Sequence, residues 1–225
     1  MFRKLVAAAI ASVLAVSPVL AGEKKFEAGV NSPSKYVPNG FVVEREQVFQ
    51  PRIGLRYGDL TASSWHNYST EKGRLTETDA SIGLDNLSVY DFGLSAGYTY
   101  LNIPDADFGW TEEVNATVKG DVGPVGLEVR AAHDIGNAGG DYASATIGKE
   151  FSVAEKVNMV PTYTLGWNGN YLREGSGFSY QRFTVSWQIK ADEVTTITPS
   201  ISFSDARNSG FEDVVFGGVD FNVEF

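Results

Sequence analysis

The sequence predicts an all-β fold: a transmembrane, antiparallel, up-and-down β-barrel of about twelve strands. One observation is a period-two alternation of apolar and polar residues along most of the chain, the pattern of strands with one apolar and one polar face. Another is that short and long connections alternate between these segments, as in barrels of the bacterial outer membrane. A third is a secretory signal at the amino end, matched by an amphipathic strand with an aromatic last residue at the carboxyl end.

Residues 1–21 have the anatomy of a secretory signal peptide. Arg3 and Lys4 precede an apolar run over residues 5–16, and small side chains follow at the positions that a signal peptidase reads. The run is shorter than the roughly 20 apolar residues that a transmembrane helix needs. We therefore expect two parts: a signal peptide that is removed on export, and an outer-membrane barrel domain over residues 22–225.

The barrel strands follow from the alternation, in chain order. The clearest is residues 90–100, where Phe92, Leu94 and Ala96 lie on one face and Ser95 on the other. Over the whole set, the polar face consists mainly of Ser, Thr, Gly and mixed charges, which suits a narrow, water-filled lumen. The expected strands are residues 25–36, 48–57, 60–68, 74–84, 90–100, 110–119, 125–132, 141–151, 157–168, 182–190, 196–204 and 214–225.

The connections between these strands fall into two classes. Tight turns are predicted at residues 58–59, 85–88, 120–124, 152–156 and 191–193. Longer polar loops are predicted at residues 33–47, 69–73, 103–109, 134–140, 169–177 and 205–213. Because the two classes alternate and the strand number is even, we expect turns at one end and loops at the other. Both termini then lie at the turn end, which in outer-membrane barrels faces the periplasm.

The last predicted strand, residues 214–225, indicates both closure and export. Phe221, Val223 and Phe225 share its apolar face. A closed barrel pairs its last strand with its first, so no edge remains free. A final strand that ends in Phe resembles the assembly signal of bacterial outer-membrane barrels, which implies the barrel-assembly machinery as a partner. We expect the protein in the cell outer membrane, in contact with its lipid and lipopolysaccharide.

Composition argues against several other classes. The chain contains no Cys, and therefore no disulfide and no lipid-modified cysteine. Without Arg3 and Lys4, 16 basic residues remain against 28 acidic ones, a formal net charge of −12 compared with −10 for the full chain. This negative balance argues against nucleic acid as a partner. Nothing in the sequence indicates a cofactor.

Charged residues on the polar faces are the candidate functional residues. Opposite charges across a lumen of this width would line a small pore with a transverse field, or would pair and plug it, because a buried charge must be paired. Lys190, Asp220 and Glu224 fall on the same face. The candidate pore-lining residues are Arg52, Arg56, Glu77, Asp79, Asp91, Glu113, Lys119, Glu128, Arg130 and Arg182.

The two histidines and two acidic loops suggest other chemistry. His133, with Ser144 across a hairpin, could form the nucleophile–base pair of a lipid hydrolase, but an interfacial histidine is the simpler interpretation. His66 has no paired ligand, so a metal site is not predicted there. The loops 103–109 and 134–141 carry carboxylates that could bind Ca²⁺, although solvated loops are the simpler interpretation. The sequence predicts that the protein is not an enzyme.

Three short motifs stand near the start of the expected mature chain. Residues 34–40 read Ser-Lys-Tyr-Val-Pro-Asn-Gly, Gln50-Pro51 follows, and then Trp65-His66-Asn67. In this order they resemble the opening of the TorF-like porins, a family of small outer-membrane barrels. Asn39 stands where that family usually has Arg, so no role of that Arg carries over. The resemblance implies a channel function.

The leading functional hypothesis is a porin, an outer-membrane channel for passive diffusion of small polar or ionic solutes. The alternative is a plugged structural or surface-interaction barrel that acts through its extracellular loops. A lipid hydrolase that uses His133 ranks third. The sequence leaves open the solute, the oligomeric state, whether the lumen is open, and whether loop 33–47 folds inward as a constriction.

Overall fold

The computed structural model describes residues 24–172, 176–207 and 212–225. The predicted signal peptide lies outside the described residues. Within these ranges the chain forms thirteen strands and one short 3-10 turn, η1 (Pro38–Gly40). The strands are β1 (Lys24–Pro33), β2 (Val48–Tyr57), β3 (Leu60–Ser69), β4 (Arg74–Val89), β5 (Phe92–Asn102), β6 (Trp110–Val122), β7 (Val125–Asp134), β8 (Asp141–Gly148), β9 (Phe151–Ala154), β10 (Val157–Gly169), β11 (Ser176–Lys190), β12 (Thr195–Ala206) and β13 (Val214–Glu224).

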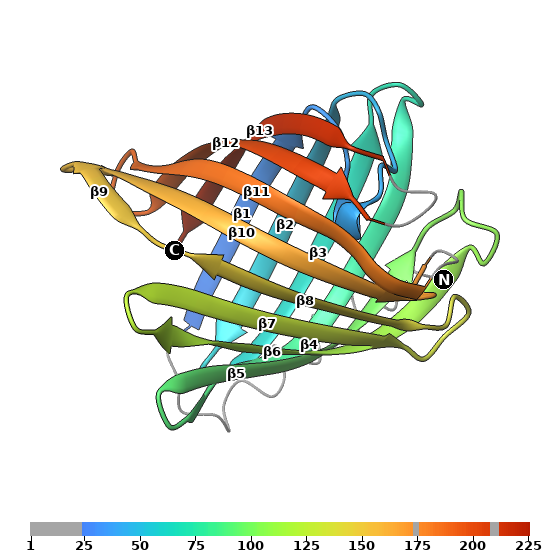
Figure 1. Ribbon diagram of the computed structural model, residues 1–225, viewed down its shortest axis with the longest axis horizontal. Helices are drawn as coiled ribbons and strands as arrows, with labels where there is room; N and C mark the ends of the chain where they lie inside the picture. Colours follow the sequence, from blue (N-terminus) through green and yellow to red (C-terminus); the bar gives the residue numbers. More distant parts are fainter. Residues whose placement is uncertain (1–23, 173–175, 208–211) are drawn as a thin grey trace.

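The strands close into one antiparallel barrel (Figure 1). β8 and β9 occupy a single position in the wall, because both pair with β10 at successive stretches of that strand. The wall therefore has twelve strand positions, as the sequence predicts. Closure comes from β1, which pairs with β2 on one side and with β13 on the other. The closed wall satisfies the backbone hydrogen bonds without leaving a free edge.

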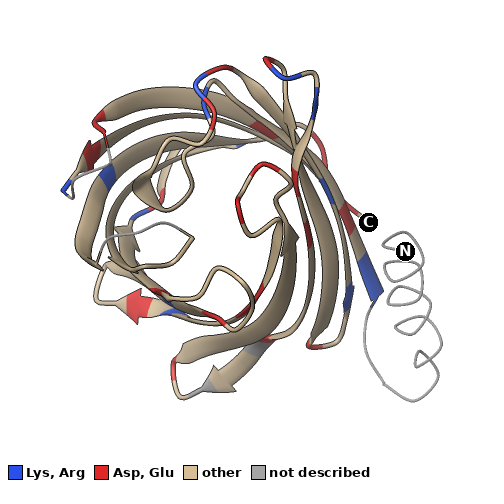
Figure 2. Ribbon diagram, turned by 90° about the vertical axis from the view of Figure 1, so that its right-hand side faces the viewer, with Lys and Arg blue, Asp and Glu red and all other residues tan. Residues whose placement is uncertain are grey.

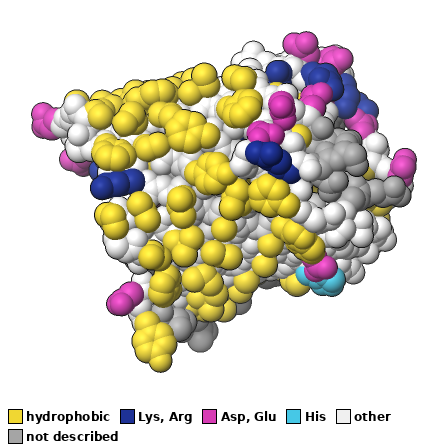
Figure 3. Space-filling model, viewed as in Figure 1, with side chains coloured by type: hydrophobic (Ala, Val, Ile, Leu, Met, Phe, Trp, Pro, Cys, Tyr) yellow, Lys and Arg dark blue, Asp and Glu magenta, His cyan; other side chains and the backbone are white. Residues whose placement is uncertain are grey.

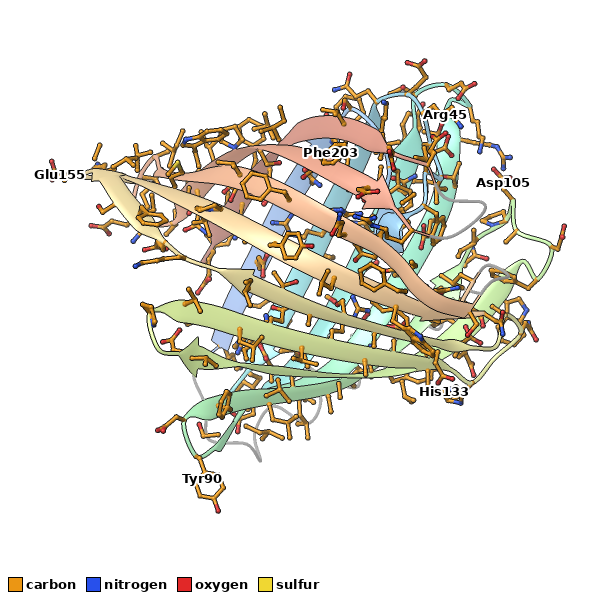
Figure 4. All side chains as sticks on the ribbon, in the orientation of Figure 1. Arg45, Tyr90, Asp105, His133, Glu155 and Phe203 are labelled. Carbon is orange, nitrogen blue, oxygen red and sulfur yellow. The ribbon has the colours of Figure 1, made fainter. Side chains whose placement is uncertain are left out.

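The two ends of the barrel differ, and we call them the turn end and the loop end. At the turn end lie the tight connections of residues 58–59, 90–91, 123–124, 155–156 and 191–194. β1 begins and β13 finishes at the same end, where Glu27 pairs with Glu224. The longer connections all lie at the opposite end. In Figure 4, Tyr90 and Glu155 mark the turn end, and Arg45 and Asp105 mark the loop end.

The largest differences from the predicted strand boundaries concern β4, β9 and β11. Residues 85–88 were expected to turn, but β4 continues to Val89, because a register shift between Leu84 and Leu87 absorbs the irregular stretch. The turn is formed instead by Tyr90, with a φ of 56°, and Asp91, which are therefore not part of a strand. Residues 151–154 form β9 rather than a turn, and β11 begins at Ser176, earlier than expected.

The two faces of the wall have different chemistry. Large apolar side chains such as Ile53, Phe183 and Ile201 are about half exposed on the outer face, where they can contact lipid. Figure 3 shows hydrophobic side chains over the middle of the visible wall and charged ones toward its ends. The inner face carries hydroxyl pairs between neighbouring strands, such as Thr184 with Ser202 at 2.7 Å. This division confirms the predicted apolar-out, polar-in pattern.

No helix among the described residues is long and apolar enough to cross a membrane.

A hydrogen-bonded ion network spans the seam where the first and last strands meet. Arg52 on β2 donates to both carboxylate oxygens of Asp220 on β13, at 2.6 and 2.9 Å, and to Glu27 on β1 at 3.2 Å. It also donates to Asn222 at 3.0 Å. Gly29 on β1 makes room for the guanidinium, since a Cβ there would lie 2.7 Å from Cζ of Arg52. One side chain thus ties three strands together across the closure.

Candidate functional site in the lumen

The loop between β1 and β2 folds into the barrel. Its residue Tyr36 packs against Trp65 of β3, with the rings tilted at 44° and their centroids 5.7 Å apart, and pairs through its backbone with Glu44 near the end of the loop. Between them the chain reverses through η1, where Asn39 and Gly40 take left-handed φ values of 44° and 88°. The motif that carries the sequence resemblance is therefore the part of the loop that enters the lumen.

The same loop reaches the opposite wall. Arg182 on β11 donates to the carbonyl oxygen of Val37 at 2.7 Å. Gly40 lies flat against the ring of Tyr180, so close that a Cβ would come within 2.3 Å of the ring. β3 and β11 are on opposite sides of the closed sheet. The loop therefore crosses the lumen, and Figure 2, which looks into the loop end, shows loop segments inside the ring of strands.

A second loop segment, the one that follows β10, also enters the lumen. Tyr171, just after β10, is buried, and its hydroxyl donates to Glu113 on β6. Its ring lies 5.9 Å from that of Tyr142, whose hydroxyl is 2.8 Å from the hydroxyl of Tyr180. Tyr36 and Tyr171 are not among the lumen residues that the sequence predicts. Both lie in loops, where a period-two alternation does not indicate which way a side chain points. Only the motif around Tyr36 pointed to that loop.

A cavity of about 490 Å³ remains between these two loop segments and the wall from β4 to β7. It runs from Asp105 in the β5–β6 loop to Ser81 and Thr99 on the wall. Four carboxylates and two cationic side chains border it. These are Lys72, Glu77, Asp79, Asp105, Glu113 and Arg130.

The charged groups of this cavity differ in how they are paired. Arg130 contacts Glu113 at 3.1 Å. Glu77 accepts a hydrogen bond from Tyr36, and burial raises the pKa of that tyrosine well above its usual value, so the hydroxyl remains a donor. Oδ1 of Asp79 is buried and has no hydrogen-bond partner among the described residues. Neither Glu77 nor Asp79 forms an ion pair within the part of the chain that the structure describes, where the nearby cations Lys72 and Arg130 pair with other carboxylates.

An ion network at the loop end connects three loops. Lys72 lies 2.9 Å from Glu44 and 3.1 Å from Asp105, which also pairs with Arg74 at 2.5 Å. The hydrogen bond to Glu44 raises the pKa of Lys72. The hydrogen bonds from Lys72 and Arg74 lower the pKa of Asp105. This network holds the outer part of the inward loop against its neighbours.

Acidification is expected to loosen this network. Because the folded pKa of Asp105 is lowered, its stabilising contribution is present above the unfolded value near ~3.9 and is lost as pH falls through the folded pKa. A spin label at Glu71→Cys, in a chain without other cysteines, should become more mobile at about pH 3 than at pH 7. With Asp105→Asn the label should already be mobile at neutral pH. Equal mobility in both proteins at both pH values would contradict this role.

Of the predicted pore-lining residues, the structure brings Glu77, Asp79, Glu113 and Arg130 together at the cavity. Arg182 lies apart on β11, half-buried, with its guanidinium 5.0 and 5.2 Å from the rings of Tyr180 and Phe216. Four others form three ion pairs along the wall. Their contacts are Arg52 with Asp220, Arg56 with Asp85 at 2.5 Å, and Lys119 with Glu128 at 3.0 Å. Asp91 is the exception, because it lies exposed in the β4–β5 turn.

The structure does not bring together His133 and Ser144, the pair ranked in the sequence analysis behind the simpler interpretation of an interfacial histidine. His133 lies on the outer rim near the loop end (Figure 4), and its Nδ1 is 2.8 Å from Asp141. Ser144 pairs in register with Arg130, one position out of phase with the pair of His133 and Asp141, so it faces the lumen. His66, on the outer face, contacts the hydroxyls of Ser64 and Thr78 at 3.2 and 3.1 Å. Within the described ranges its ring is thus oriented by hydroxyls and not by a carboxylate.

Asp105 and Asp134, one carboxylate from each acidic loop, are already engaged by other groups of the protein. Asp105 binds Lys72 and Arg74, as described above. Asp134 accepts hydrogen bonds from the Thr111 hydroxyl at 2.6 and 2.7 Å and from the backbone of Gly136 and Gly139. These contacts stabilise the conformation of the two loops. In the described residues, no group of three or more His, Cys, Asp or Glu side chains is arranged to hold a metal ion.

No family model and no curated protein matches this sequence. Solved structures do match the fold. The KdgM porin in complex with disordered oligogalacturonate superposes with a TM-score of 0.60 at 9% identity, covering 89% of this chain and 99% of that one. The COG4313 outer membrane channel from Pseudomonas putida F1 gives 0.59 at 12% identity, with 91% and 96% covered. The NanC porin gives 0.53 at 11% identity, with 90% and 99% covered. The chain thus has the fold of small outer-membrane porins and channels.

Proposed function

We propose that this protein is an outer-membrane channel through which small polar or ionic solutes diffuse. One observation carries the proposal: a closed barrel, apolar outside and polar inside, has at its loop end a cavity of about 490 Å³ lined by charged side chains. A wall of twelve strands is wider than the eight-stranded barrels that side chains fill. The likeness in fold to solved porins and channels supports the same function.

The proposal includes the export and placement of the chain. Residues 1–21 act as a signal peptide, and residues 22–225 form the barrel in the outer membrane. The turn end faces the periplasm, and the loop end meets lipopolysaccharide and the cell exterior. The final strand, which ends at Phe225, is read by the barrel-assembly machinery. Outer-membrane lipid then contacts the apolar band of the wall.

The TorF-like family is part of the proposal for a structural reason. Its motif residues contact one another: the ring of Tyr36 packs against that of Trp65, and the side-chain amide of Gln50 donates a hydrogen bond to Asn67 at 3.0 Å. These contacts lead the inward loop onto the wall. Residues separated in the sequence therefore act as one unit, the constriction. The neighbour solved with oligogalacturonate holds a polyanion, but the cavity here has more carboxylates than cations, so that ligand is not extended to this chain.

Conductance tests this function. The refolded protein, shown to be folded by its heat-modifiable mobility, is placed in a planar bilayer under a salt gradient. Discrete current steps with a finite reversal potential would support an open, charge-selective channel. The absence of current steps from a folded barrel would favour the alternative, a plugged barrel that acts through its loops.

That alternative has support of its own. Ion pairs such as Arg52 with Asp220 and Arg130 with Glu113 neutralise much of the inner face. A variant without residues 37–43 separates the two cases, because an open channel should gain conductance and a plugged one should begin to conduct. The hydrolase hypothesis lacks its serine, and we expect His133→Ala to leave lipid turnover unchanged.

A further inference from the structure

We propose that the lumen cavity beside Glu77 and Asp79 binds the ammonium groups of small organic cations. The inference rests on the proposed channel function and names its solute class. Glu77 and Asp79 lie on β4, and Glu113 lies on β6, where all three border the same cavity. The cation among them on the wall, Arg130, is paired with Glu113. The other two carboxyl groups, Glu77 and Asp79, form no ion pair within the described residues.

Asp79 supplies the independent observation. This residue lines the cavity, and its Oδ1 is buried and lacks a hydrogen-bond donor among the described residues. A buried polar atom without a partner is costly, and a carboxylate oxygen more so than a neutral one. A ligand with N–H donors would remove that cost. An ammonium group offers three donors and the opposite charge.

The other lining residues suit the carbon skeleton of such a ligand. Tyr36, Phe41 and Tyr171 present rings to the cavity. Aromatic faces attract cations and also pack against alkyl chains. Tyr36 already donates to Glu77, so that carboxylate is oriented before a ligand arrives. A volume of about 490 Å³ lies within the range of sites for small molecules.

Anions and metal ions fit less well. Arg182, on the opposite wall, lies over the rings of Tyr180 and Phe216 and donates to the Val37 carbonyl of the inward loop. An anion in the cavity would therefore meet only Lys72 and Arg130, both already paired. The described carboxylates are not grouped closely enough to hold a metal ion.

Binding of 1,4-diaminobutane tests the inference. Titration calorimetry on the folded, micelle-bound barrel should detect binding of this dication, while glutarate, a dianion of similar size, should not bind. Asp79→Asn and Glu77→Gln should each weaken binding at least tenfold. The matched control is Glu128→Gln, which removes an inner-face carboxylate that Lys119 already pairs at 3.0 Å. Its affinity should equal that of the original protein.

The same proteins in planar bilayers separate this inference from the channel proposal. A conducting barrel should be cation-selective, and 1,4-diaminobutane should block it less well in Asp79→Asn. Binding without conductance would overturn the channel function and keep the site. Conductance without binding, or equal binding by all variants, would overturn the site and keep the channel.

Discussion

Replacing Gly40 with valine should raise the single-channel conductance at least about twofold, because the inward loop can no longer rest against β11. Gly40 has a φ of 88°, which L residues rarely adopt, and its Cβ would lie 2.3 Å from the ring of Tyr180. That ring is held by its hydroxyl contact with Tyr142 at 2.8 Å, so it cannot easily yield. Single-channel recording in planar bilayers measures the change.

Gly109→Val is the matched control for this experiment. Gly109 also lies in a loop and has a φ of 68°, but nothing lies within 4 Å of a Cβ at that position. It therefore carries similar backbone strain without the clash. If both variants changed conductance equally, strain in the loops would explain the effect. If Gly40→Val conducted like the original protein, the inward loop would not be the constriction.

Replacing Arg52 with alanine should lower the free energy of unfolding by about 2 kcal/mol, because it strips a shared partner from Asp220, Glu27 and Asn222. The guanidinium and Asp220 are 26% and 29% exposed, so the loss is smaller than for a fully buried pair. The contacts also join β2, β1 and β13, where the barrel closes. Urea unfolding followed by heat-modifiable mobility in lipid vesicles measures the change.

Two further variants serve as controls for the Arg52→Ala result. Arg45→Ala removes an ion pair with Glu212 in which the arginine is 71% exposed, and should change stability by less than about 0.5 kcal/mol. In the double variant Arg52→Ala with Asp220→Ala, part of the lost stability should be recovered, because the half-buried Asp220 carboxylate is then no longer left without its partner. Strict additivity of the two substitutions would show that the seam is not held by this pair.

The strands were predictable because alternation is a local property of the chain. Inner residues such as Arg52, Glu77 and Glu113 lie on the polar faces that the pattern assigned to them. The pattern was wrong at Asp91, where β4 runs past Asp85 through a register shift and places the turn at residues 90–91. Such irregularities depend on the fit between neighbouring strands, which a period-two count does not contain.

The contents of the lumen were less predictable. The sequence suggested a transverse field or paired charges. In the structure Arg52 is paired along the seam, and Arg182 lies on the wall opposite the carboxyl groups of β4. His133 and Ser144, the alternative ranked behind an interfacial histidine, do not pair. Ser144 lies opposite Arg130, three positions from His133, and an odd offset along a strand puts two residues on opposite faces.

The wall of this protein could be predicted from its amino-acid order: the all-β class, the twelve positions, the apolar outer face and the separation of turns from loops. Each of these follows from the period of the strand and from turn chemistry, which act over a few residues. What fills the lumen depends on the closed fold. The contact of Arg182 with Val37 joins residues 145 positions apart, and Tyr171 reaches Glu113 across 58. Such contacts exist only after the barrel has closed, because closure brings opposite walls within reach of one loop.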